Sequence, residues 1–168
     1  MIKKAAKAKS ETISLRLEPQ ARFALDFICR VKGQKITTAV ERAIQEAAKE
    51  VRLGVDESGR SLDWVHYWDP SEGVRTLNLI SEPTYPAQFA DDEMRVFTST
   101  HREFFFAGPH LNEPNRLFVD VLWPSMQDFL ALWRETKSTD PWAAGRAMAE
   151  RLKAANLEPP AWPRKDVT

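Results

Sequence analysis

The chain has 168 residues and equal numbers of basic and acidic side chains, 24 of each. This length allows one domain or two. It contains no apolar run near the roughly 20 residues of a membrane span and no apolar stretch after its basic N-terminus. We therefore expect neither a membrane-spanning segment nor a secretory signal, and the single cysteine favours a cytoplasmic protein.

Charge is unevenly distributed along the chain. Residues 1–53 hold 12 basic and 6 acidic side chains, a net charge of +6, whereas residues 54–168 have a net charge of −6. This asymmetry favours an anionic partner for the first part. Residues 1–10 are expected to form a disordered basic arm in which Lys7 and Lys9 contact phosphates. A tail that only confers solubility is the alternative.

Residues 12–17 alternate strictly between polar and apolar side chains. This period predicts a strand with Thr12, Ser14 and Arg16 on one face. A strand of this length needs partners for its backbone donors and acceptors, and no second strand is predicted nearby. The simplest partner is the same strand of a second copy. The antiparallel ribbon so formed fits the major groove of DNA.

Two helices are predicted after this strand. Pro19 opens the first and Gly33 ends it. The second runs from about Thr37 to about Arg52, with Thr37 and Thr38 as candidate caps. Its apolar positions recur at spacings of three and four along one face, at Val40, Ala43, Ile44, Ala47 and Val51.

Residues 11–51 resemble the ribbon-helix-helix family, the fold of the methionine, Arc and CopG-type repressors. The resemblance implies a unit over residues 11–53 that dimerises through the intermolecular ribbon. It assigns base reading to Thr12, Ser14 and Arg16, and phosphate binding at the start of the second helix to Lys35, Thr37 and Thr38. Apolar side chains of the strand and both helices would form the dimer core, namely Ile13, Leu15, Leu17, Leu25, Ile28, Val40 and Ile44.

Two alternatives to these assignments remain. Residues 12–51 could form a strand and two helices of an ordinary mixed domain, and Arg16 could be a surface residue paired with Glu18. Cys29, on the apolar face of the first helix, is expected to be a buried, inert thiol.

The first helix carries apolar side chains beyond the expected dimer core. Phe23, Phe27 and Val31 recur every four residues. Because contiguous exposed apolar surface usually marks a contact, we expect the second half of the chain to pack on this stripe.

Residues 54–61 are polar, include two glycines and are expected to form a linker. All six tryptophans follow it, and this composition predicts a compact, aromatic-rich, mostly helical α(+β) domain over residues 62–168. The fold class is therefore mainly α. A short helix or strand is expected over residues 62–68, followed by a helix that starts at Asp69-Pro70-Ser71-Glu72 and stops before Pro83.

Four further elements and an extended end are expected in this domain. A helix begins near Asp91, residues 117–123 favour a strand over a helix, and Ser125 and Asp140-Pro141 each open a helix. Residues 159–163 are expected to be extended over the domain.

No metal, cofactor or catalytic site is predicted. His66, His101 and His110 lack a second histidine or cysteine at metal-ligand spacing, and no nucleophile motif or phosphate loop accompanies them. We expect them to be partly buried, structural histidines. The aromatic residues could line a ligand pocket or a protein-binding face, but core packing is the favoured interpretation.

The sequence favours a homodimeric, sequence-specific DNA-binding repressor, with the possibility of higher-order assembly on DNA. Residues 62–168 would then sense a small ligand or bind a protein. The alternatives are an antitoxin that also binds a toxin and an accessory DNA-binding protein for plasmid partition or conjugation. An enzyme is the weakest interpretation.

Overall fold

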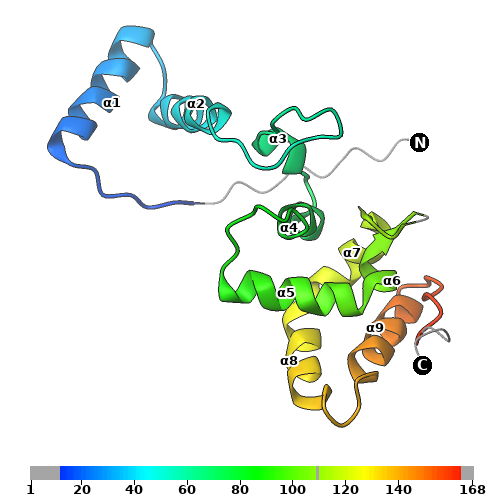
Figure 1. Cartoon of the computed structure of the whole chain (residues 1–168). Helices are drawn as coiled ribbons and strands as arrows, with labels where there is room; N and C mark the ends of the chain where they lie inside the picture. The colour runs from blue at the N-terminus through cyan, green and yellow to red at the C-terminus, as the bar shows by residue number, and fades with distance from the viewer. Residues whose placement is uncertain (1–11, 109, 164–168) are drawn as a thin grey trace, which may run out of the picture.

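The computed structural model describes residues 12–108 and 110–163, and it is mainly helical (Figure 1). The first elements are α1 (Pro19–Lys32), α2 (Ile36–Lys49), α3 (Trp64–Tyr67), α4 (Glu72–Ile80), α5 (Phe89–Thr100) and α6 (Arg102–Phe105). They are followed by β1 (Phe106–Ala107), β2 (Glu113–Pro114), α7 (Arg116–Leu122), the 3-10 helix η1 (Trp123–Ser125), α8 (Met126–Thr136) and α9 (Ala143–Ala154).

Helices α1 and α2 form an N-terminal pair whose principal contact is with each other. Proline begins α1, and Gly33 ends it in the left-handed conformation with φ 60°, as the sequence predicts. The N–H of Gln34 donates to the carbonyl of Cys29 at 2.9 Å and closes the turn. Figure 1 shows this pair to one side of the helical body formed by α4–α9.

The limits predicted for α2 are corrected at both ends. The helix begins at Ile36 and ends at Lys49, with Lys35 in extended backbone at the N-cap. Thr37 and Thr38 therefore lie inside the first turn and do not cap the helix. Only Gly33, Gln34 and Lys35 lie between the two helices, so α2 starts earlier than its threonines suggest.

The expected packing of the second half of the chain on α1 is wrong. Phe23, Phe27 and Val31 are 72%, 58% and 67% exposed. Helix α1 has no buried residue and α2 has one, Ala39. The helical body buries Phe97, Phe104 and Phe105 in a core of its own instead, so the apolar stripe of α1 is left uncovered in the single chain.

A tight loop joins the N-terminal pair to α3. An isolated bridge pairs Val55 with Ser61, and the Asp56 carboxylate between them accepts hydrogen bonds from the N–H groups of Ser58 and Arg60. The hydrogen bond from the Ser58 hydroxyl first, and then those from the N–H groups of Arg60 and Ser58, lower the pKa of Asp56 to about 2. The Tyr67 hydroxyl donates to the carbonyl of Leu53 at 2.5 Å and ties this loop to α3.

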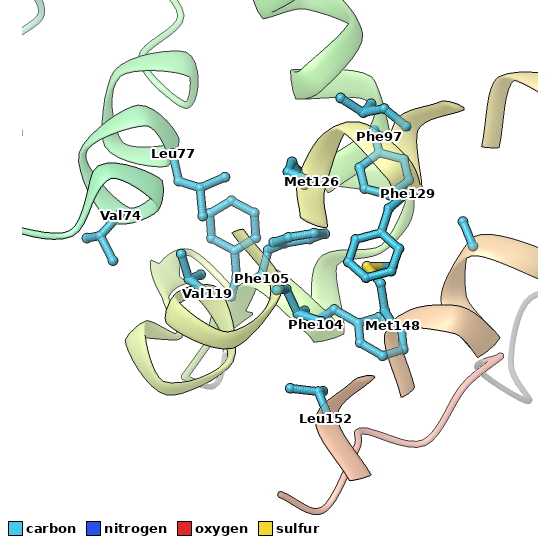
Figure 2. Close-up of a cluster of buried hydrophobic side chains, with 14 of the residues drawn as sticks. Val74, Leu77, Phe97, Phe104, Phe105, Val119, Met126, Phe129, Met148 and Leu152 are labelled. Atoms are coloured by element: carbon cyan, nitrogen blue, oxygen red, sulfur yellow. The ribbon is translucent and has the colours of Figure 1, made fainter. Parts of the chain in front are cut away.

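One hydrophobic core holds the helical body together (Figure 2). Leu77 of α4, Phe97 of α5, Phe104 and Phe105 of α6, Val119 of α7, and Met148 and Leu152 of α9 are fully buried. The rings of Phe97 and Phe105 meet edge to face, with centroids 5.9 Å apart. As predicted, α4 buries Val74, Leu77 and Ile80 on one face and ends before Pro83.

The structure corrects the strand predicted at residues 117–123. This segment forms α7, capped by the side chain of Asn115, which accepts from the N–H of Phe118. Val119 and Leu122 are buried one turn apart, a spacing that suits a helix rather than a strand. Packing on the core and a local cap therefore override the β-branched and aromatic composition.

Two predicted helix starts fall slightly early. Helix α4 is capped by Ser71, not Asp69; the Asp69 carboxylate instead accepts from the N–H of Ser71 at 2.7 Å. Helix α9 begins at Ala143, and the Asp140 carboxylate accepts from the N–H of Trp142 at 3.3 Å. In both cases the aspartate forms a turn that precedes the helix.

The strands β1 and β2 form a small antiparallel hairpin with Phe106 opposite Pro114 and Ala107 opposite Glu113. The segment after α9 returns along the body, as predicted. Trp162 from this segment packs against the core beside Phe104 and Trp142.

Candidate nucleic-acid interface

Residues 12–17 run outside any helix or strand before α1. The side chains of Thr12, Ser14 and Arg16 are all exposed. Within the described ranges, Arg16 forms no ion pair with Glu18, the partner that a purely structural role would give it. The three polar side chains are therefore available to a partner, and the ribbon itself stays a prediction.

The apolar side chains of the same segment are also uncovered. Ile13, Leu15 and Leu17 are 74%, 69% and 44% exposed. Because both the polar and the apolar side chains of residues 12–17 are exposed, no buried apolar contact holds this segment in place in the single chain.

The expected dimer-core residues of the two helices are also exposed or only half-buried. Ile28 and Ile44 are 39% and 58% exposed, and Leu25 and Val40 are half-buried. Cys29, expected to be buried, is half-buried and free. The N-terminal pair therefore carries more apolar surface than its own two helices cover.

The first turn of α2 offers donors to an anion. No side chain caps this helix and no acidic residue lies in its first turn. Lys35 and Thr37 are exposed there and Thr38 is half-buried, so a cation and two hydroxyls surround N–H groups that have no partner inside the helix. This arrangement can hold a phosphate group. Lys7 and Lys9 lie outside the described residues.

Possible metal ligands are not gathered at one place among the residues that the structure describes. These residues contain no cluster of three or more histidine, cysteine or acidic residues that could hold a metal ion. His101 is fully buried, but His66 and His110 are exposed, which corrects the expectation of three partly buried histidines. No helix in the described ranges is both long enough and apolar enough to cross a membrane.

The tryptophans divide between the core and the surface. Trp123, Trp133 and Trp162 pack against the buried cluster, whereas Trp64, Trp68 and Trp142 are 39%, 52% and 38% exposed. Sequence patterns gave no sign of the polar cleft around Arg95 and Arg102, because its lining comes from separate elements. Comparison of the chain with models of known families, with curated proteins and with solved structures found no match.

Proposed function

We propose that this chain is a homodimeric, sequence-specific DNA-binding protein that acts as a transcriptional repressor. The observation that carries the proposal is the uncovered segment at residues 12–17, followed directly by a helix pair with one buried residue. Such a unit gains little from its own core, and burial of apolar surface is the main favourable contribution to folding. A second copy supplies both the missing ribbon partner and the missing apolar cover.

In the proposed dimer the polar face of the ribbon enters the major groove. The Arg16 guanidinium donates two hydrogen bonds to O6 and N7 of a guanine, and Thr12 and Ser14 make less selective contacts. Lys35 and the first turn of α2 bind the adjacent phosphate and set the register of the ribbon. The excess of basic residues in residues 1–53 strengthens the attraction to DNA.

The antitoxin interpretation is not favoured by the same structure. A toxin-binding segment of that class is usually short and folds only when bound, whereas residues 62–163 contain a helical body with its own core. An accessory protein for plasmid partition or conjugation would bind DNA in the same way and differ in its target site.

The experiment is selection of bound duplexes from random sequence at near-physiological salt, with the wild type, Arg16→Ala and Arg42→Ala. The last variant removes the same charge from the exposed side of α2. The wild type and Arg42→Ala should enrich one symmetric motif. Arg16→Ala should lose discrimination at one base pair of each half-site, by about 1–3 kcal/mol. Enrichment of no motif by the wild type would refute the proposal, and an unchanged motif in Arg16→Ala would refute the base-reading role.

A further inference from the structure

A polar cleft lies where the end of α4, one side of α5 and α6, and the β1–β2 hairpin meet. Its cavity has a volume of ≈ 320 Å³. Most of its lining is polar or basic, and none of it is acidic: Ile80, Ser81, Arg95, Thr98, Ser99, Arg102, Phe106 and Asn112. Two guanidinium groups therefore line one cavity that has no carboxylate in its lining, in a part of the chain that is acidic overall.

Arg95 is held in this cleft with part of its hydrogen-bonding capacity unused. Its Nε–H donates to the carbonyl of Ile80 at 2.6 Å, and Nη1 donates to the Asp92 carboxylate at 3.3 Å. Its Nη2 is buried and has no hydrogen-bond partner among the described residues. A buried donor of a charged group without a partner is costly, so an acceptor in the cleft that this nitrogen can reach by a small rotation would be stabilised.

Arg102, which also lines the cleft, is fixed by contacts with the hairpin. Its Nη2 donates to the carbonyls of Leu111 at 2.6 Å and His110 at 3.3 Å, and its guanidinium lies 5.7 Å from the centre of the Phe106 ring. These contacts fix the side chain in advance of a ligand, which lowers the entropy lost on binding.

Two of the three hydroxyl groups that line the cleft already donate hydrogen bonds to the main chain. Thr98 Oγ1 donates to the carbonyl of Met94 at 2.9 Å, and Ser99 Oγ donates to that of Arg95 at 2.6 Å, so both already have a use for their hydrogen. The remaining donors that line the cavity are Ser81, Asn112 and the two arginines. This donor set suits an oxyanion with several acceptor oxygens.

A second cavity of ≈ 330 Å³ shares Ser81 and Asn112 with the first and extends toward His66, Tyr67, Asn78 and Glu82. The Glu82 carboxylate accepts from the hydroxyl of Thr84 at 2.7 Å and from its N–H at 3.1 Å, and these two hydrogen bonds are the main cause of its lowered pKa. The cleft thus has a cationic end and an end that accepts hydrogen bonds.

We propose that this cleft binds a small polar ligand, whose anionic group, a phosphate or a carboxylate, lies between Arg95 and Arg102. The rest of the ligand, bearing hydroxyl or amino donors, extends toward Glu82. The inference goes beyond the proposed DNA-binding function and does not depend on it, because the cleft uses no residue of the N-terminal pair.

The test is thermal unfolding of the full chain with inorganic phosphate or succinate, at an ionic strength held constant with sodium chloride. Asn112→Asp places a negative charge in the lining, and Arg102→Gln removes a positive one. The matched controls Asn156→Asp and Arg151→Gln make the same charge changes outside both cavities. A saturable rise in the unfolding temperature of the wild type is expected with at least one probe.

The control variants should keep this rise, whereas the two cleft variants should raise the dissociation constant about tenfold or more. A response to phosphate alone identifies a phosphate ligand, and a response to succinate alone identifies a carboxylate. Equal responses of cleft and control variants, or no response of the wild type beyond that to chloride, would overturn the proposal. If Arg102→Gln fails to fold, Asn112→Asp decides the result, because its side chain is exposed.

Discussion

The indole of Trp162 packs on the imidazole of His101, with ring centroids 5.0 Å apart and planes tilted by 32°. The two residues are distant in sequence, and the contact holds the C-terminal segment on α5 and α9. Gly145 in α9 makes the close approach possible, since a Cβ atom at this position would collide with the indole. His101 donates Nδ1–H to the carbonyl of Phe97 at 2.9 Å, and within the described ranges its Nε2 is buried without a partner.

This burial predicts a pH dependence of stability. Desolvation lowers the pKa of His101 below its usual 6.5, although the hydrogen bond to Phe97 and the charge of Glu103 oppose the shift. Below that pH the unfolded chain binds a proton that the folded chain does not, so the free energy of unfolding falls as the pH drops through 6.5 toward the folded pKa. Above pH 6.5 the contribution of the neutral ring is complete.

His101→Phe should therefore flatten the dependence of the unfolding free energy on pH between about pH 5 and 7. His66→Phe introduces the same ring at an exposed position and is the control for the effect of the substitution itself. Urea denaturation at a series of pH values measures it. Equal slopes in all three proteins would show that His101 is not held neutral by the fold.

Trp162→Ala tests whether the C-terminal segment is part of the core. The substitution removes contacts with His101, Phe104 and Trp142 and should lower the free energy of unfolding by about 2–4 kcal/mol. Trp68→Ala is the control, because Trp68 is 52% exposed and its loss should cost less than about 1 kcal/mol. Similar losses in both variants, measured by denaturant titration, would mean that the segment contributes no more than surface packing.

Asn115→Ala tests the cap of α7. The side chain accepts from the N–H of Phe118, so its removal should lower the free energy of unfolding by about 1 kcal/mol. Asn112→Ala, in the nearby hairpin and exposed, should have almost no effect. An unchanged free energy of unfolding in Asn115→Ala would indicate that burial of Val119 and Leu122 alone keeps this segment helical.

These elements show which features the sequence makes predictable. In α1 and α4 the signals are local: proline and glycine mark the ends of α1, and apolar residues three apart mark the buried face of α4. For α7 local composition is misleading, because Val119 and Val121 favour a strand, while the cap and the burial of one face favour a helix. The predicted start of a helix is wrong where an aspartate forms a turn before the helix, as Asp69 does.

The two proposed sites also differ in how far the sequence alone can predict them. The side chains assigned to DNA are close in sequence, so the alternation of residues 12–17 is enough to group Thr12, Ser14 and Arg16. The cleft gathers Ser81, Arg95 and Asn112 from three separate segments, and only the packing of α4 against α5 and β2 brings them together. A ribbon between copies has no partner within one chain, so it stays a prediction.

Ile44→Asp tests the proposed dimer core. Ile44 is 58% exposed in the single chain, and a charge at that position would be buried in the dimer without a partner. The variant should sediment as a monomer at concentrations where the wild type is dimeric. Val96→Asp places the same charge at a comparably exposed position on α5 and should remain dimeric. A monomeric wild type, or a dimeric Ile44→Asp variant, would remove the basis of the ribbon.

Lys35→Ala tests the phosphate contact at the start of α2. A phosphate contact carries no sequence information, so the variant should weaken binding to all duplexes by a similar factor and keep the selected motif. It should also reduce the slope of log affinity against log salt by about 1 for each copy that makes the contact. Lys49→Ala is the control, because Lys49 lies at the opposite end of α2 and pairs with Glu46 at 2.8 Å. If both variants change the slope equally, general charge explains the binding, and α2 does not anchor a phosphate through its first turn.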